Sequence, residues 1–488
     1  MAHNEEISIE VDEWAHLGVD EWAQLDSTVT LQESSRCYIH KVPRKLLVAG
    51  DDKYEPHTIS IGPYHRGKPM EITDEYHKKV YLRSFLLRNK ASNIKWADVV
   101  NKINEIRDDA RKCYSEIIDL DDEEFSRMLI LDGCFILELM YKFQEDESNF
   151  GEDILLSKTW MVPSIRRDLV LLENQIPMTV LSCLYDLTYS PSPQTSPPNV
   201  NGPPSPSPIP SRSLRKKVTK WFSSKSEFQP RSPIIHSRSS TSTQSSSLNR
   251  LIISFFDPIL PTISEDKRDS DIHGEHLLDL LRNLLLRQSQ TSSEDEVGSN
   301  PLWEHTTCAT DLHEAGVNFK KKDTSDGLLD ISFTNGTFEI PPFFFGDSWT
   351  VLFPNIIALE QCRHDYNDEI TSYATLMDNL IDSHDDVKLF REIGIISGSS
   401  KENETIAHAV NNLCKKAIVP KFYYDELCNR VNAYRKTTIP TWRAAFMRKV
   451  IHTPWAGVSV LAAVTLLGLT IAQTVFAVLS WVIAKNQK

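Results

Sequence analysis

The chain has 488 residues, 40% of them hydrophobic and 25% charged, and its formal net charge is −14 at pH 7. This length suits one large helical domain or a few ordinary ones, with enough apolar residues for a sizeable core. The negative charge argues against nucleic-acid binding, which needs a surplus of Lys and Arg. The eight cysteines form no CxxC pair and are predicted to be reduced and mostly buried.

The first 35 residues form an acidic segment without the basic flank and apolar core of a signal peptide. Residues 11–26 are a tandem octamer, VDEWAHLG followed by VDEWAQLD. The composition predicts a mobile tail. A short docking motif for a partner is the alternative interpretation of the repeat.

The first part of a helical domain is predicted over residues 36–189. It opens with an irregular stretch rich in Pro, Gly and His, with strand-like alternation at residues 58–61. Three helices are predicted after this stretch, and the second, at residues 121–144, is apolar almost all round, which predicts a central position in the fold. Pro177 predicts a kink in the last one. These helices are expected at residues 75–89, 121–144 and 164–187.

Residues 190–254 form a Pro-, Ser- and Arg-rich insert with nine Lys or Arg against one Glu. Such a composition cannot bury a core, so the insert is predicted to be disordered. A short basic amphipath within it could contact an anionic membrane surface or an acidic partner, and a solvated linker is the simpler interpretation. This basic surface segment is carried by Arg215, Lys216, Lys217, Lys220 and Trp221.

The second part of the helical domain is predicted over residues 255–452. Its clearest β signal is a hairpin at residues 328–341, where Asn335 and Gly336 suit a two-residue type I′ turn. The predicted fold class is therefore mostly α, a large helical soluble domain with one small hairpin, interrupted by the insert. Further helices are expected at residues 273–286, 348–364, 367–383, 385–395, 402–417 and 421–443.

Residues 457–483 hold no charged side chain in 27 positions. A helix of this length measures about 40 Å, enough to cross a hydrocarbon core of about 30 Å with some tilt. Trp455 and Trp481 lie near its ends, where indoles favour the headgroup region. The five residues after the span predict a tail anchor with the body in the cytoplasm. Small residues at four-residue spacing permit a homodimer through this helix.

Motifs for nucleotide, zinc or serine-hydrolase chemistry are absent from the sequence, and no cofactor, metal ligand or catalytic residue is predicted. Three carboxylates nevertheless lie in apolar helical runs, at Asp132, Glu173 and Glu360. A buried, unpaired carboxylate is destabilising, so each needs a partner. Arg166 and Arg363 are candidates for that role in structural polar clusters. If the three acids instead converged, they could form an acid–base or metal site.

Many blocks of the chain are typical of one family. They include YEPHTISIGPYHRGKP, FSRMLILDGCFILEL, DLVLLENQIPMTVL, LLDISFTNGTFEIPP and LFPNIIALEQC, in that order. Over residues 36–484 the chain resembles the plant family known as domain of unknown function 247, or uncharacterised protein family 0481. The resemblance implies a single-pass membrane protein of land plants, with the plasma membrane favoured. It implies no established enzymatic activity and no functional residues to carry over.

Some grass relatives in this family are associated with self-incompatibility, which implies recognition or signalling. We therefore expect a membrane-anchored, non-enzymatic plant protein that acts through an unidentified protein partner. The alternative is an enzyme whose buried carboxylate/Arg site is formed by Asp132, Glu173 and Glu360.

Overall fold

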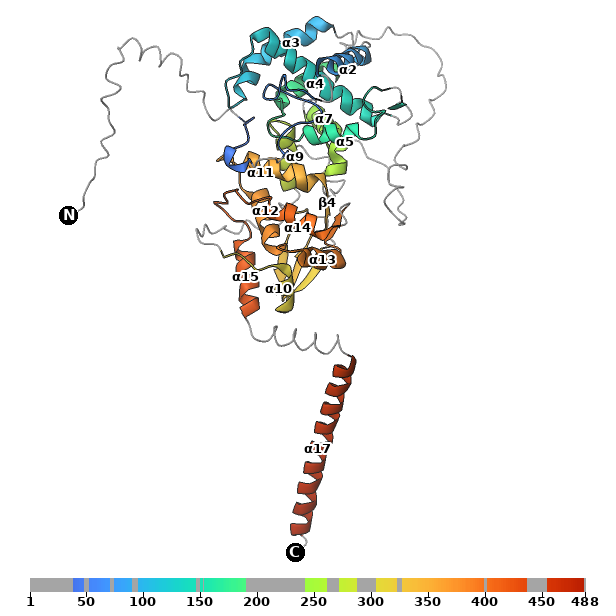
Figure 1. Ribbon diagram of the computed structural model, residues 1–488, viewed down its shortest axis with the longest axis vertical. Coiled ribbons are helices and arrows are strands. Elements are labelled where there is room, and N and C mark those ends of the chain that lie inside the picture. The colour runs from blue at the N-terminus through green and yellow to red at the C-terminus, as the bar shows by residue number, and fades with distance from the viewer. Residues whose placement is uncertain are drawn as a thin grey trace, which may run out of the picture.

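The computed structural model describes most of the helical body and the C-terminal helix. Figure 1 shows an elongated body, with the N-terminal helices at one end and the C-terminal helices and strands at the other. The fold is mostly α, as predicted. The described residues are 38–47, 52–70, 74–89, 95–145, 150–151, 153–189, 242–260, 272–287, 304–322, 327–398, 402–436 and 454–486.

The N-terminal half is built around α4, which packs against α2, α3, α6 and α7. Nearly every side chain from Phe125 to Met140 is buried, which confirms the predicted central helix. Asp121 caps its first turn by accepting a hydrogen bond from the backbone N–H of Glu124 at 2.8 Å. The elements of this half are η3 (Arg44–Leu46), α2 (Asp74–Arg88), α3 (Trp96–Lys112), α4 (Asp122–Gln144), α5 (Met161–Asp168), α6 (Met178–Tyr189), α7 (Ser242–Phe256) and η7 (Asp257–Ile259).

A non-helical stretch separates α5 from α6, so the prediction of one helix over residues 164–187 was wrong. Within this stretch the side chain of Asn174 donates to the carbonyl oxygen of Asp168 at 2.9 Å, and that of Gln175 donates to two further carbonyls at 2.8 Å. The side-chain amides therefore donate to backbone carbonyl oxygens that would accept from backbone N–H groups in a helix. Pro177 then lacks an N–H with which to continue a helix.

Helix α7 corrects the end of the predicted disordered insert, since residues 242–254 are helical. Leu251, Ile252 and Phe255 lie on this helix and are buried, and the helix packs against α4 and α6. The Ser-rich start of α7 concealed this apolar stripe. The remainder of the predicted insert and the N-terminal octamer repeat lie outside the described residues.

The C-terminal half is joined to the first through α11, which packs against α9 on one side and α12 on the other (Figure 1). The helices expected between residues 273 and 443 are present in the described part of the chain, and several begin later or end earlier than predicted. A π-helical turn, η8, leads directly into α11. Helix α9 (Leu277–Arg287) lies with the first half, where the backbone N–H of Leu278 donates to the side chain of Gln175. The elements of the second half are α10 (Ala309–Glu314), η8 (Ser348–Leu352), α11 (Phe353–Glu360), α12 (Glu369–Leu380), α13 (His384–Ile393), α14 (Asn403–Asn411) and α15 (Asp425–Lys436).

The described residues of this half include two small sheets. The predicted hairpin is confirmed, because β2 pairs antiparallel with β3 across a turn in which Asn335 has φ 50° and Gly336 has φ 77°. Two parallel pairings, β1 with β3 and β4 with β5, were not predicted from the sequence. The strands are β1 (Asn318–Lys321), β2 (Ser332–Thr334), β3 (Thr337–Ile340), β4 (Phe343–Phe345) and β5 (Ile396–Gly398).

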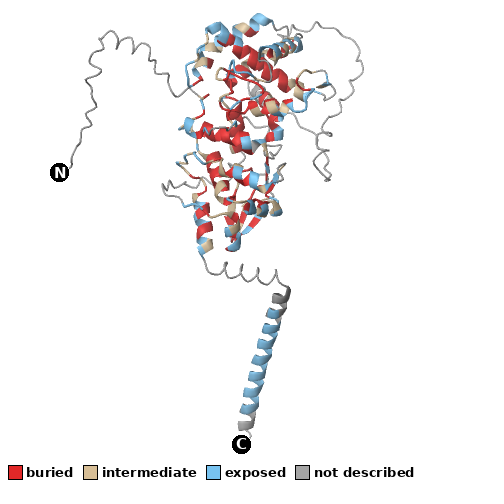
Figure 2. Cartoon of the chain, viewed as in Figure 1, coloured by how far each residue is buried: buried red, intermediate tan, exposed pale blue. Residues whose placement is uncertain are grey.

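Helix α17 (Pro454–Asn486) covers the predicted span at residues 457–483. Figure 2 shows the contrast with the body: buried residues fill the two packed halves, whereas the described residues of α17 are exposed. Phe476 and Trp481 are 72% and 64% exposed. Large apolar side chains on an unpacked helix of this length are what a membrane-spanning segment presents to lipid.

Candidate functional site

Buried polar side chains of the N-terminal half gather around one extended segment. Residues 58–61, predicted as a strand, pair with no strand in the described part of the chain. The backbone N–H groups of most of these residues and of their neighbours instead donate to side chains of α4 and of the region around α5. Asp168 accepts hydrogen bonds from His57, Thr58 and Ile59, Asn174 accepts from Ile61, and Asp132 accepts from Gly62.

Asp132, on α4, forms a buried ion pair with Lys78 of α2. Asp132 is 1% exposed and Lys78 6% exposed, and the carboxylate lies 2.6 Å from the ammonium nitrogen. Lys78 also donates to the carbonyl oxygen of Ser60, and Asp132 accepts the N–H of Gly62 at 2.8 Å. Hydrogen bonds to both charges offset part of their desolvation, which an unpaired group would bear alone. This pair therefore fixes the extended segment between two helices.

Asp168 is a further buried acid, and its burial was not predicted from the sequence. Burial raises its pKa, and the backbone N–H groups of Ile59 and Thr58 and the charge of Arg167 act against that rise. Arg167 lies 2.8 Å from the carboxylate. A signal was available, because an acid in the last turn of α5 is opposed by the helix dipole and needs a compensating partner.

Glu173 lies in the stretch between α5 and α6 and contacts the N-terminal segment. It accepts the backbone N–H of Val42 at 2.8 Å, and its second oxygen lies 3.4 Å from Nε2 of His65. Burial raises the pKa of Glu173. Burial, with Lys68 and Lys41 nearby, lowers the pKa of His65 to about 4, so this imidazole is neutral at physiological pH.

Glu360 ends α11 and is held by Arg282 of α9. The guanidinium Nε donates to one carboxylate oxygen at 3.0 Å, and the backbone N–H of Thr371 donates to the other at 2.9 Å. Burial raises the pKa of Glu360 to about 7, against the effects of Arg282 and Thr371. This ion pair spans the junction between the two halves of the body.

The two arginines proposed as partners for these acids lie elsewhere. Arg166 donates to the carbonyl oxygen of Phe255 at 2.7 Å and its guanidinium lies over that ring, and burial lowers its pKa to about 10. Arg363 pairs with Asp365 and lies over the ring of Tyr366. Hydrogen-bond acceptors and aromatic rings near each arginine determine where its guanidinium lies. The spacing of apolar residues in the sequence does not indicate these partners.

The structure thus gives Asp132, Glu173 and Glu360 three separate sets of partners, which are Lys78, Val42 with His65, and Arg282 with Thr371. Within the described ranges, no three His, Cys, Asp or Glu side chains are grouped so that they could hold a metal ion. Each of the three carboxylates therefore holds chain segments together through partners of its own.

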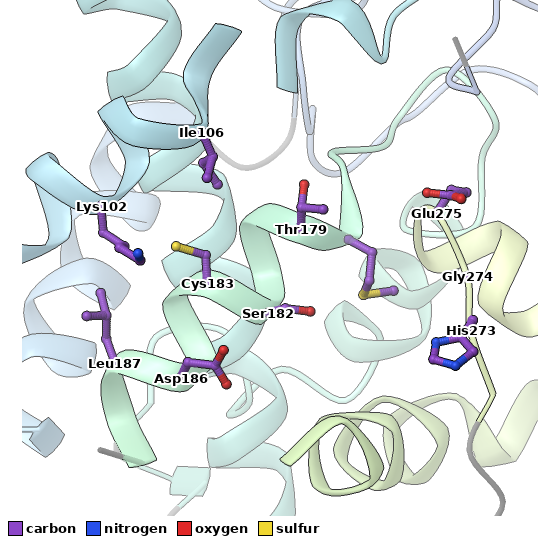
Figure 3. A pocket seen from close by; sticks show the side chains of 11 residues that line it. Lys102, Ile106, Thr179, Ser182, Cys183, Asp186, Leu187, His273, Gly274 and Glu275 are labelled. Atoms are coloured by element: carbon purple, nitrogen blue, oxygen red, sulfur yellow. The ribbon is translucent and has the colours of Figure 1, made fainter. Parts of the chain in front are cut away.

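A hollow of about 520 Å³ lies among α3, α6 and the residues that precede α9 (Figure 3). Cys183 and Asp186 of α6 and Lys102 of α3 line it, with His273 and Glu275 on the other side. Burial raises the pKa of Cys183 to about 11, against the charge of Lys102. The thiol is therefore protonated at neutral pH and a weak nucleophile.

The remaining predicted residues concern membranes. In the described part of the chain, one helix is long and apolar enough to cross a membrane, and its most apolar stretch is Ala462–Trp481. Trp455 and Trp481 lie near the two ends of α17, and their placement at the membrane interface stays a prediction. The candidate basic segment lies outside the described residues and comprises Arg215, Lys216, Lys217, Lys220 and Trp221.

These features define a largely helical protein with an internally paired polar core and one exposed apolar helix at its C-terminal end. The family model DUF247, described as a plant protein of unknown function, matches residues 39–469, and the chain belongs to that family. The predicted resemblance is confirmed.

Two relatives from Arabidopsis thaliana match nearly the whole chain. UPF0481 protein At3g47200 is 26% identical over 467 residues, which cover 91% of this chain and 87% of the relative. Putative UPF0481 protein At3g02645 is 25% identical over 502 residues, which cover 89% of each chain. No solved structure matches the chain.

Proposed function

We propose that α17 anchors this protein in a membrane as a single span and that the helical body acts there in protein–protein recognition or signalling. The observation that carries the proposal is the exposed apolar surface of α17. Its side chains from Val464 to Trp481 include many large apolar groups that are at least half exposed. In water that surface would be an aggregation hazard, whereas a bilayer buries it.

A buried core helix is the alternative account of an apolar segment. The short apolar helix Trp349–Glu360 illustrates that case, because all of its residues except Thr350 are buried and it has too few of them to cross a bilayer. Helix α17 differs in length and in exposure, and both differences support a membrane span.

The recognition role is supported by how the body uses its charged groups. The buried acids are paired inside the core, where they stabilise the fold, and the thiol of the hollow at Cys183 is protonated. Aromatic side chains of the kind that dominate binding interfaces are exposed elsewhere on the body, with Trp96 49% and Trp160 48% exposed. These features suit a rigid body that presents a surface.

Arginine substitutions within the span test the anchor. An arginine at the centre of a membrane helix opposes insertion by about 2.5–3.5 kcal/mol. We expect Leu467→Arg/Ile471→Arg to move the protein from plant membranes to the soluble fraction or to aggregates. The matched variant Leu467→Ile/Ile471→Leu keeps the apolar surface and should stay in the membrane. Equal membrane retention of both variants would refute the anchor.

Proximity labelling tests recognition. A biotin ligase fused to the N-terminus of the full chain should enrich a defined set of neighbouring proteins in plant cells. The same ligase on the α17 span alone controls for proteins that merely share the membrane. Identical labelled sets from the two fusions would show that the body recognises nothing, and would contradict the recognition role.

A further inference from the structure

A second hollow, of about 540 Å³, lies between the segment after η3 and the helices η8, α11 and α14. Its inner wall is apolar and includes the buried side chains of Leu46, Tyr54, Trp349 and Leu413. The cations Lys53, Lys415 and Lys416 also line it, and the last two are exposed. Among the described residues Asp52 is the acid in the lining. The hollow therefore combines an apolar wall with a positively charged border.

The positive charge extends along two adjoining loops, at residues 41–47 and 414–418. Gln361 connects them, because its side-chain oxygen accepts from Lys45 at 3.1 Å and from the backbone N–H of Ile418 at 2.8 Å. Lys416 donates to the carbonyl oxygen of Leu47 at 3.2 Å.

Much of this charge is not neutralised within the body. Lys45 and Lys416 contact neutral oxygens, and Arg44 and Lys415 form no ion pair with any described residue. In a chain of net charge −14, Lys415 and Lys416 on the border of the hollow, with Arg44 and Lys45 on the adjoining loop, mark a binding surface for an acidic group.

The N-terminus of the same chain has the complementary chemistry. Residues 1–37 hold nine Asp or Glu against one Arg. Each octamer of the tandem repeat places an Asp-Glu pair directly before a tryptophan, at Trp14 and Trp22. An indole fits an apolar wall, and the adjacent carboxylates suit a border of lysines.

The tail is also long enough to reach the hollow. Fifteen residues lie between Trp22 and Tyr38, the first described residue, and this segment can span about 50 Å when extended. Leu46, in the wall of the hollow, is eight residues beyond Tyr38 and therefore within about 30 Å of it.

We propose that this cationic hollow binds the chain's own acidic, tryptophan-bearing repeat at residues 11–26. This contact is independent of the membrane anchor. A tether holds the repeat at an effective concentration on the order of 1 mM. A site with a dissociation constant near 0.1 mM would then be occupied about ten times as often as it is empty.

Hydrogen exchange of the full chain in zwitterionic nanodiscs measures this occupancy. The amides of residues 11–26 should exchange about tenfold more slowly than in an unstructured peptide of the same sequence. Lys415→Glu/Lys416→Glu should abolish the slowing. The matched charge change Lys102→Glu/Lys112→Glu, on α3, should leave it intact.

A second pair of variants separates binding from folding. Asp12→Lys/Glu13→Lys/Asp20→Lys/Glu21→Lys alters the tail alone and should also abolish the slowing, with the exchange of the body unchanged. Combining the tail and hollow reversals should restore it. Fast exchange of the repeat in the unmodified chain would overturn the proposal. Slowing that grows with protein concentration, or that needs added anionic lipid vesicles, would overturn it in favour of a second copy or of a membrane.

Discussion

Replacing Lys78 with methionine should strongly destabilise the body, because it leaves the carboxylate of Asp132 buried without its counter-charge. Asp132 is 1% exposed and lies 2.6 Å from the Lys78 ammonium. Removing one member of a buried ion pair costs about 3–5 kcal/mol. The next residue provides a matched control: Lys79 lies 2.6 Å from Glu75, and both side chains are about half exposed. A surface pair at this i,i+4 spacing contributes about 0.3–0.5 kcal/mol.

Urea unfolding of the full chain in one detergent, monitored by tryptophan fluorescence, compares the two variants. We expect Lys78→Met to lower the free energy of unfolding by about 3–5 kcal/mol and Lys79→Met by less than about 1 kcal/mol. The double variant Lys78→Met/Asp132→Leu should recover most of the loss, since it leaves no unpaired charge. Equal effects of Lys78→Met and Lys79→Met would refute the buried pair.

Backbone strain at Gly62, the titration of Glu360 and the orientation of the body can each be tested. Gly62→Ala should lower the free energy of unfolding by at least about 3 kcal/mol in the same urea assay, because a Cβ at φ +71° would lie 2.4 Å from a backbone oxygen. The control Gly67→Ala, at φ +80° with no atom near the added Cβ, should lower it by only about 1–2 kcal/mol. Burial raises the pKa of Glu360 to about 7 in the folded state from 4.5, so the folded protein binds more protons at this site than the unfolded chain, and the stabilisation by Glu360 falls as the pH rises from 4.5 to 7. The unfolding free energy of Glu360→Gln should lack that decline across this range, and a pH dependence equal to that of the unmodified chain would contradict the raised pKa. If the body faces the cytoplasm, neither Asn335 nor Asn403 carries a glycan. A mass shift on glycosidase treatment would place the body in the secretory lumen if the double variant Asn335→Gln/Asn403→Gln abolishes that shift.

The sequence predicted the elements whose evidence is local. The apolar run of α4, the Asn335–Gly336 turn and the uncharged stretch of α17 each lie within one short segment, and each is present where expected. The type of helix or turn at these places is fixed by neighbouring residues, so long-range packing has little room to change it.

The elements that the sequence missed depend on distant partners. Strand β5 is three residues long and gains its pairing from β4, more than fifty residues earlier. The stretch between α5 and α6 is non-helical because Asn174 bonds backbone atoms at Ile59 and Ile61 as well as Asp168. Periodicity within one segment carries no information about such contacts.

In the candidate site, too, local sequence predicted some features and distant partners decided the others. The burial of Asp132 and Glu360 could be predicted from their apolar surroundings, and both are buried. Their partners could not, because Lys78 and Arg282 lie on other helices, 54 and 78 positions away in sequence. Lys78 has a second lysine beside it in the sequence, and only the packing of α2 on α4 shows which of the two is buried.

Membrane attachment through α17 is tested most directly by alkaline carbonate extraction of plant membranes that contain either the full chain or a chain lacking residues 457–488. Carbonate removes peripheral proteins and leaves spanning helices in the bilayer. We predict that the full chain stays in the membrane pellet and that the truncated chain appears in the soluble fraction. Release of the full chain by carbonate, or membrane retention of the truncated chain, would contradict the assignment of α17 as the anchor.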